Sequence, residues 1–228
     1  MQRITGKTAS WEIYSGLKSR GPIIVRADGR GFKKILEGSK KPYDLDFARS
    51  IVGAAELFFS GSGLDPKLAF VFSDEVNLLF AQAPFGGRIE KLDSVIAGFL
   101  SGALSLSLGQ VVSMDCRVLP ICRDEASIYL SERQDETWRN HVFSYGFYAL
   151  VSDGQSRGQA MDLLRGMKES QIHDLLFKRG INLARTPAWE RRGVMICRRG
   201  DEVVQDWEPP LFRSPEGQKL VEDLFCKG

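Results

Sequence analysis

An apolar run of strand character, residues 22–27, ends abruptly in the sequence Asp-Gly-Arg-Gly-Phe at residues 28–32. Aliphatic residues of this kind bring a strand through a hydrophobic core. The two glycines let the backbone turn where side chains would clash, so we expect a turn directly after the strand. Asp28 is then left at the strand's exit, between Arg26 and Arg30. Such a stretch is typical of a surface turn, or of a nucleotide site where a carboxylate binds a hard cation beside phosphate-binding arginines.

A second acidic turn lies between two further apolar runs. Residues 68–73 and 76–81 have strand character and form a predicted hairpin around Ser73-Asp74-Glu75. This spacing fits a tight polar turn. It also fits a second carboxylate delivered at the end of a strand, and two such strands supply what a two-metal phosphoryl-transfer site requires. We therefore interpret Asp28 and Asp74 as candidate catalytic acids, with Glu75 beside them.

The order of the predicted elements indicates the fold class. Helical spacing of apolar residues predicts helices over 44–60 and 91–108, and a fourth strand is predicted over 111–118. The order is then β-α-β-β-α-β, which is the ferredoxin-like or split βαβ arrangement. We predict an α+β fold in which an antiparallel sheet packs against two helices. In this topology the first and third strands are neighbours, so Asp28 and the acidic hairpin can meet.

The second half of the chain is predicted to add helices and a basic hairpin. The expected elements are a long helix over 124–150, short helices over 161–178, a loop over 181–189, a hairpin over 193–207 and a helix over 216–225. A short helix is also expected near the start of the chain, over 11–17. We predict a palm-like catalytic unit at residues 1–150. Residues 151–228 are expected to pack on it and to complete one compact unit.

Composition excludes several classes of protein. The 228 residues are 43% hydrophobic and 26% charged, as in an ordinary globular domain. No segment reaches the roughly 18 consecutive apolar residues of a membrane span, and residues 1–10 lack a signal-peptide core. The four cysteines are dispersed and the two histidines are isolated, which argues against a structural zinc site. We expect a cytoplasmic protein with free thiols and no membrane partner.

The net charge of +2 does not by itself indicate a nucleic-acid partner, so only local clusters of charge are informative about binding. The lysines of residues 32–41 form either a solvated loop or a phosphate contact beside Asp28. A denser group surrounds Trp189 and consists of Arg185, Arg191, Arg192, Arg198 and Arg199. It is either an exposed basic hairpin or a surface for phosphate contact and base stacking, and we favour the second. On the long helix, Arg133, Glu136 and Asn140 share a face that is either functional or simply solvated.

Nine short stretches, all in register, resemble the tRNA-histidine guanylyltransferase family, especially its shorter archaeal and bacterial Thg-like members. They are Arg26-Ala27-Asp28-Gly29-Arg30-Gly31-Phe32, Lys41-Pro42-Tyr43-Asp44, Phe72-Ser73-Asp74-Glu75, Asp115-Cys116-Arg117-Val118, Ser131-Glu132-Arg133-Gln134, Arg139-Asn140-His141, Leu175-Leu176-Phe177, Gly180-Ile181-Asn182 and Arg191-Arg192-Gly193. They span about residues 12 to 197. The resemblance implies a polymerase-like palm domain that works in the reverse, 3′-to-5′ direction.

The family's activity implies a function for this chain. Such enzymes add nucleotides to the 5′ end of tRNA, which is activated by ATP or GTP and then attacked by the 3′-hydroxyl of an incoming NTP. By resemblance, Asp28, the Gly29 carbonyl and Asp74 bind two Mg²⁺ ions, and Glu75 supports them. The partners implied are tRNA, ATP, GTP and other NTPs, and a homo-oligomer, specifically a tetramer.

The resemblance and the clustering of charge together predict two sets of binding residues. The nucleotide-binding set is Arg26, Gly29, Arg30, Gly31, Phe32, Lys33, Lys41, Ser73, Asp74, Arg133 and Asn140. The tRNA-binding set is Asn182, which matches a position that affects activity, and the basic residues Arg191, Arg192, Arg198 and Arg199.

One departure from the family pattern bears on the reaction. Eukaryotic members carry His-Ile-Asn-Asn after their Arg-Gln motif, a segment linked to non-templated addition of one G. This chain has Trp138-Arg139-Asn140-His141 there, and Ile172 where the eukaryotic enzymes have a lysine. Template-dependent repair of 5′-truncated tRNA is therefore the leading hypothesis. The alternatives are a strict tRNA-histidine guanylyltransferase that adds G at position −1, a nucleotide cyclase-like palm, and an RNA-binding module with a vestigial site.

Overall fold

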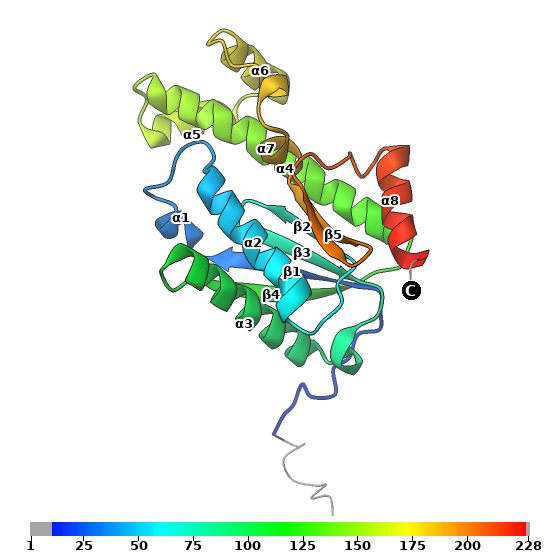
Figure 1. The fold of residues 1–228 in the computed structure, drawn as a ribbon. Coiled ribbons are helices and arrows are strands. Elements are labelled where there is room, and N and C mark those ends of the chain that lie inside the picture. Colours follow the sequence, from blue (N-terminus) through cyan, green and yellow to red (C-terminus); the bar gives the residue numbers. More distant parts are fainter. Residues whose placement is uncertain (1–10, 227–228) are drawn as a thin grey trace, which may run out of the picture.

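Aliphatic and aromatic residues dominate the central strands of a single antiparallel sheet in the computed structural model, which describes residues 11–226 (Figure 1). The strands are β1 (Ile23–Arg30), β2 (Leu68–Phe72), β3 (Glu75–Phe80), β4 (Ser113–Pro120), β5 (Val194–Arg199) and β6 (Glu202–Asp206). Their order in the sheet is β4-β1-β3-β2-β5-β6. The predicted α+β fold is confirmed, including the neighbouring positions of β1 and β3. The β5–β6 hairpin extends the same sheet beyond β2.

Helices cover both faces of the sheet and one end of the molecule. They are α1 (Phe32–Ile35), α2 (Leu45–Gly61), α3 (Ile89–Leu108), α4 (Glu125–Ser152), α5 (Arg157–Arg165), α6 (Glu169–Phe177), α7 (Ala188–Arg192) and α8 (Pro215–Cys226), with short 3₁₀ turns η2 (Pro84–Gly87) and η3 (Leu183–Arg185). The predicted start of α2 is confirmed, because the Asp44 side chain accepts hydrogen bonds from the backbone N–H groups of Asp46 and Phe47.

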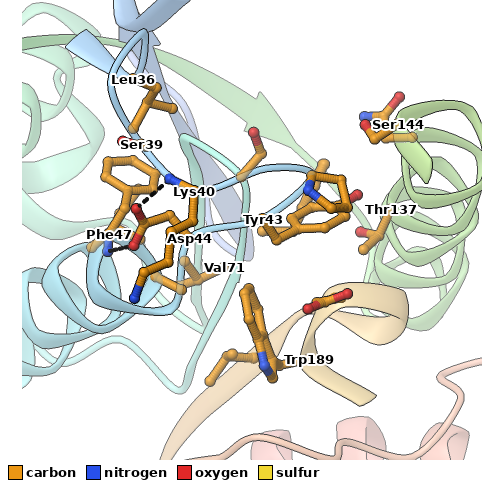
Figure 2. A pocket seen from close by; sticks show the side chains of 18 of the residues that line it. Leu36, Ser39, Lys40, Tyr43, Asp44, Phe47, Val71, Thr137, Ser144 and Trp189 are labelled. Atoms are coloured by element: carbon orange, nitrogen blue, oxygen red, sulfur yellow. Dashed lines mark hydrogen bonds between the residues drawn. The ribbon is translucent and has the colours of Figure 1, made fainter. Parts of the chain in front are cut away.

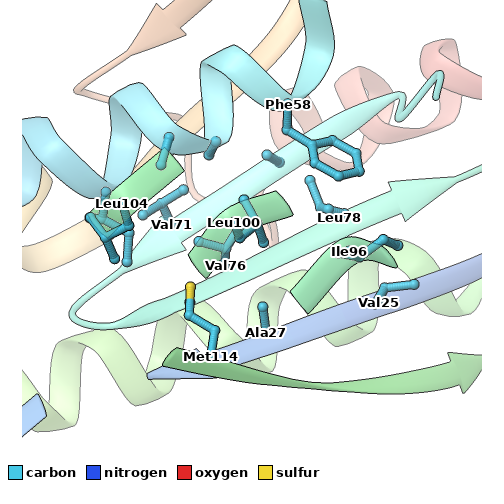
Figure 3. Close-up of a cluster of buried hydrophobic side chains, with 14 of the residues drawn as sticks. Val25, Ala27, Phe58, Val71, Val76, Leu78, Ile96, Leu100, Leu104 and Met114 are labelled. Carbon is cyan, nitrogen blue, oxygen red and sulfur yellow. The ribbon is translucent and has the colours of Figure 1, made fainter. Parts of the chain in front are cut away.

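The sheet separates two hydrophobic layers. Figure 3 shows the layer beneath α2 and α3, where strand residues such as Val25 and Leu78 pack against Phe58 of α2 and Leu100 of α3. The opposite face, with Ile24 among its buried residues, packs against the first turns of α4 and against α8. These two layers hold the strands in a fixed register.

Helix α4 belongs to two hydrophobic clusters. Its first turns contribute Ala126 and Leu130 to the sheet-side layer. Its last turns pack with α5 and α6 around Val142 and Leu150 in a separate cluster. With 28 residues the helix is about 42 Å long, so it joins the sheet to the helical end of the molecule.

Helix α3 has the length and apolar composition of a membrane span. Its fully buried residues, Leu92, Ile96, Leu100 and Leu104, all lie in the core beneath the sheet. These four residues form the buried face of the helix, whereas Leu106 on its other side is exposed.

The largest difference from the sequence prediction lies at the end of β1. We expected a turn at Gly29, but the strand continues to Arg30 and the turn begins at Gly31, whose φ is 72°. Within the strand, Gly29 has another role. A Cβ atom there would lie 2.8 Å from the side chain of Asp74 and 2.5 Å from that of Phe32. The glycine thus permits a close approach of the hairpin rather than a turn.

Smaller corrections concern local structure. Residues 11–17 form hydrogen-bonded turns rather than the expected short helix. The basic loop after β1 contains the single helical turn α1, and the loop expected over 181–189 includes η3 and leads into α7. Strand β4 begins two residues later than predicted. Short helices of one turn carry too little periodicity to be recognised from sequence.

Candidate active site

The ladders of the sheet bring the predicted acids together. Asp28 of β1 pairs with Glu75 of β3 on one side and with Asp115 of β4 on the other. Asp74 occupies the two-residue loop between β2 and β3, and its carbonyl accepts a hydrogen bond from the N–H of Gly29 at 2.9 Å. Two carboxylates from segments far apart in sequence are therefore held by backbone hydrogen bonds at one end of the sheet.

Two arginines hold the Asp28 carboxylate. Its Oδ2 accepts from Arg26 Nε at 3.2 Å and lies 3.1 Å from a guanidinium nitrogen of Arg117. Arg26 was predicted at this site, whereas Arg117 was identified only as part of a motif. Its position follows from the β1–β4 register, in which Arg117 lies opposite Arg26. These cations offset the charge of Asp28 and leave its side chain 30% exposed.

Asp74 has a different electrostatic environment. Its carboxylate accepts a hydrogen bond from the hydroxyl of Ser73, and no cation pairs with it among residues 11–226. Burial raises the pKa of Asp74, and the neighbouring Asp28 raises it further. An additional cation beside Asp74 would lower the energy of its ionised form.

Glu75 lies behind these acids and is fully hydrogen-bonded. Arg133 of α4 donates to both of its oxygens, at 2.8 and 2.6 Å, and Asn77 donates to Oε1 at 2.7 Å. Tyr129 in turn donates to Asn77 at 2.7 Å. Burial raises the pKa of Glu75, while the hydrogen bonds from Asn77 and Arg133 oppose that rise. The network ties α4 to the acidic end of the sheet, so Glu75 is placed to support its neighbours.

The oxygen donors suit a hard divalent ion. Mg²⁺ is typically bound by one or two protein carboxylates, and substrate phosphates complete its ligands. Asp28 and Asp74 provide such carboxylates, and the missing Cβ of Gly29 leaves the space that the Asp74 side chain occupies. Residues 11–226 contain no group of three His, Cys, Asp or Glu side chains arranged as a metal site, so the substrate would have to supply further ligands.

A cavity of about 250 Å³ is lined in part by Ser73 of the acidic hairpin. Figure 2 shows other residues of its walls, among them Tyr43 and Trp189. Three residues predicted to bind nucleotide line it together: Lys41 from the loop after α1, Ser73 from the hairpin and Asn140 from α4. Its walls also contain the rings of Tyr43 and Trp189, whose centroids are 5.9 Å apart at an angle of 82°. A mainly apolar cavity with aromatic walls and a few polar groups is typical of a small-molecule site.

One face of α4 lines the site from end to end. Arg133, Thr137, Asn140, Ser144 and Tyr148 follow each other at intervals of three or four residues, which places them in a row along the helix. Arg133 pairs with Glu75, the next three line the cavity, and Tyr148 lies beyond it. Glu136 pairs with Arg133 at 2.7 Å, three residues along the helix, so these two side chains lie together on α4 as expected.

Four other predicted nucleotide-binding residues, from Arg30 to Lys33, do not line this cavity. Phe32 is buried in the core, where its ring packs against Phe47 at 5.8 Å. Arg30 is exposed at the end of β1, and Gly31 and Lys33 lie in a second groove. Phe32 therefore stabilises the fold, whereas Arg30, Gly31 and Lys33 are exposed outside the cavity.

The structure separates the predicted basic patch. Arg191 and Arg192 of α7 donate to the carbonyls of Thr186 and Pro209, near α4. Arg198 and Arg199 stand at the far end of β5, where Arg198 donates to the Phe59 carbonyl of α2. A six-residue strand separates the pairs by roughly 17 Å. Exposed Asn182 caps η3 by accepting from the N–H of Ala184. The two arginine pairs therefore form distinct surfaces.

A buried polar cluster beneath the cavity was missed by the sequence analysis. His141 is fully buried, stacks with Tyr43 and Trp138 at 5.6 and 5.7 Å, and lies 3.0 Å from the hydroxyl of Thr186 through Nε2. Glu190, which lines the cavity, accepts a hydrogen bond from the Tyr145 hydroxyl at 2.7 Å. Only tertiary packing brings these residues together.

We expect this cluster to make stability depend on pH. Burial lowers the pKa of His141 from its ordinary value of 6.5 to about 4, and Arg191 contributes to the decrease. The unfolded chain therefore binds a proton first, and stability is lost as the pH falls from about 6.5 towards 4, by about 3 kcal/mol in total. Urea unfolding between pH 7 and 4.5 measures this slope. His141→Phe should flatten it, whereas the more exposed His173→Gln should not; an equal slope in all three proteins would contradict the assignment.

Comparison with known proteins identifies the relatives of this chain. A profile of the family described as tRNAHis guanylyltransferase matches residues 6–136, and a profile of the Thg1 C terminal domain matches residues 124–222. The tRNA(His) guanylyltransferase of Schizosaccharomyces pombe is 26% identical over 224 residues, which covers 89% of this chain and 83% of that protein.

Solved structures have the same fold. A bacterial tRNA(His) guanylyltransferase (Thg1)-like protein in complex with ATP superposes with a TM-score of 0.81, and one in complex with GTP superposes with a TM-score of 0.77. Each is 22% identical and covers 95% of this chain and 96% of the other.

Proposed function

The chain belongs to the tRNAHis guanylyltransferase family and is a nucleotidyltransferase, and from this premise we propose that it adds nucleotides to the 5′ end of tRNA in the 3′-to-5′ direction. One observation carries the proposal. The Asp28 and Asp74 carboxylates converge beside a cavity that is lined by Lys41, Ser73 and Asn140. Phosphate chemistry at such a site needs positioning and charge stabilisation rather than a protein nucleophile.

The proposed reaction has two transfers. A 5′-phosphate oxygen of the tRNA attacks the α-phosphorus of ATP or GTP, and pyrophosphate leaves. The 3′-hydroxyl of an incoming NTP then attacks the activated 5′-phosphorus, loses its proton, and displaces the nucleoside monophosphate. A 5′-triphosphorylated RNA would need only the second transfer, with pyrophosphate as the leaving group. Atoms and charge balance in both steps.

The residues of the chain have distinct roles in this scheme. Asp28 and Asp74, with the Gly29 carbonyl, would bind two Mg²⁺ ions, which supply charge neutralisation and a lower pKa for the attacking hydroxyl. Arg26 and Arg117 hold the Asp28 carboxylate in place.

The cavity would hold the activating nucleotide. The Tyr43 and Trp189 rings offer apolar surface to a base, and Lys41 and Ser73 lie where they can contact phosphate oxygens. That related bacterial proteins have been solved in complex with GTP and with ATP supports this assignment.

We further propose that addition depends on the opposing base. Of the four residues at positions 138–141, His141 is buried and Trp138 stacks on it. Arg139 and Asn140 are exposed, and Asn140 lines the cavity. Only Asn140 of this segment lines the cavity, and the sequence of the segment differs from the His-Ile-Asn-Asn that is linked to non-templated G addition. Base pairing would then select the incoming nucleotide.

A labelled RNA distinguishes the two modes of addition. The substrate is a tRNA that lacks its first nucleotide and carries a labelled 5′-monophosphate, incubated with Mg²⁺, ATP and each NTP in turn. We expect extension only by the NTP that pairs with the opposing base, and changing that base should change the NTP used. Addition of G regardless of the opposing base would favour the strict guanylyltransferase, and no addition would contradict the proposed function. A homotetramer remains a prediction, as does the cytoplasmic location.

A further inference from the structure

A second groove, of about 720 Å³, lies between the loop around α1 and the far end of α4 with the start of α5. One wall comes from residues 31–41, and the other carries Phe147, Tyr148 and Arg157. The two walls are separated by more than a hundred residues in sequence, so no local motif indicates the groove. None of the tRNA-binding residues inferred from the sequence lies in it.

The groove concentrates positive charge. Its charged lining residues are Lys33, Lys34, Lys41, Arg157 and a single acid, Glu37. In a chain with a net charge of only +2, four cations against one carboxylate make a locally basic surface. Lys34 and Arg157 are exposed, stand on opposite walls, and have no ion-pair partner within residues 11–226. An anion between the walls could therefore contact both.

Aromatic rings accompany these cations. The half-buried rings of Phe147 and Tyr148 are 5.1 Å apart at an angle of 86°. The ammonium group of Lys41 lies 5.9 Å from the Tyr148 ring centroid. Cations interleaved with ring faces are the combination that binds single-stranded nucleic acid, because phosphates contact the cations and bases stack on the rings.

The groove is continuous with the candidate active site. Lys41 lines both the nucleotide cavity and the groove. Gly31, another lining residue, is only two positions beyond Gly29, whose N–H bonds to Asp74. A strand lying in the groove would therefore lie close to the acidic pair.

We propose that this groove binds the unpaired 3′ strand of the RNA substrate next to the template base, and so places the paired 5′ end near Asp28 and Asp74. Lys34 and Arg157 contact phosphates from opposite walls, and a base stacks on Tyr148. This inference rests on the proposed function for the identity of the RNA. It places RNA on α1, α4 and α5 instead of on the β5 hairpin that the sequence indicated.

The test measures RNA binding separately from reaction. A 5′-monophosphorylated, 5′-truncated tRNA with a fluorescent 3′ end is titrated with full-length protein at several salt concentrations, without NTP. Lys34→Ser/Arg157→Ser should weaken binding about tenfold and reduce the salt slope by about 1.4, because two phosphate contacts are lost. Tyr148→Leu should weaken binding with little change in slope. The charge-matched control Lys178→Ser/Lys219→Ser, with both lysines exposed elsewhere, should bind as the unchanged protein does.

The results distinguish RNA from a free nucleoside triphosphate as the molecule that binds in the groove. If the groove variants and the control bind RNA equally, the proposal is wrong. Weaker binding of free GTP or ATP with unchanged RNA binding would also overturn it, because the groove would then serve a free triphosphate. Loss of RNA binding in a protein that never extends RNA would support the groove while contradicting the proposed function. Thermal melting of every variant shows whether it has folded.

Discussion

Asp74→Asn should abolish nucleotide addition without loss of stability. The amide keeps the shape of the side chain but removes the charge that would hold Mg²⁺ beside Asp28, so we expect activity to fall about a hundred- to a thousandfold. Burial and Asp28 both raise the pKa of Asp74, which means that ionised Asp74 is costly in the folded protein. Removing this charge should leave the melting temperature unchanged or higher.

Single-turnover extension of the labelled, truncated tRNA measures the loss of activity. Thermal melting measures the change in stability. The matched control is Asp201→Asn, which removes an exposed carboxylate from the β5–β6 turn and should keep full activity. An Asp74→Asn protein that retains more than about a tenth of the activity would place the reaction elsewhere in the molecule. A folded but inactive variant would separate a catalytic from a structural role.

Of the substitutions considered, Arg133→Met should lower the free energy of unfolding the most. The guanidinium is 12% exposed and donates two hydrogen bonds to Glu75, which is 8% exposed. Without Arg133 the carboxylate stays buried and unpaired, which costs about 3–5 kcal/mol in the free energy of unfolding at pH 7. The loss should shrink as the pH falls towards 4.5, because burial favours the protonated form of Glu75.

Urea denaturation of four proteins tests this expectation. Arg139→Met, an exposed arginine on the same helix, should change stability by less than about 0.5 kcal/mol. The double variant Arg133→Met/Glu75→Gln should recover a large part of the lost stability, since no buried charge remains. Equal destabilisation by the single and double variants would mean that packing of the arginine stem, rather than the ion pair, carries the effect.

Sequence periodicity was sufficient for the central fold. The strands around Asp28 and Asp74 are mostly apolar, with β2 apolar throughout, and α2 and α3 have clear helical spacing. Because the ferredoxin-like order makes β1 and β3 neighbours, the meeting of Asp28 with the acidic hairpin could be predicted before any coordinates. The spacing of Arg133 and Asn140 likewise indicated a common face of α4.

The features that escaped prediction all depend on contacts between distant segments. The function of Gly29 depends on how closely the 73–74 loop approaches β1, which no local pattern encodes. The sequence analysis identified His141 only as part of a motif and did not single out Glu190; their approach depends on the packing of α4 against α7. The pairs Arg191–Arg192 and Arg198–Arg199 are close together in sequence. The extended strand β5 runs between them and separates the two pairs in space.

Helix α4 fixes the distance between the acidic end of the sheet and the basic groove. Fifteen residues separate Arg133, which holds Glu75, from Tyr148 in the basic groove, and at 1.5 Å per residue this is about 22 Å. Because both ends of the helix are anchored in hydrophobic clusters, this length cannot change without disturbing one of them. A strand stacked as in a duplex, with a rise of about 3.4 Å per nucleotide, covers the same length in about six to seven nucleotides. The distance between Glu75 and the basic groove is therefore set by the length of one helix and not by a loop.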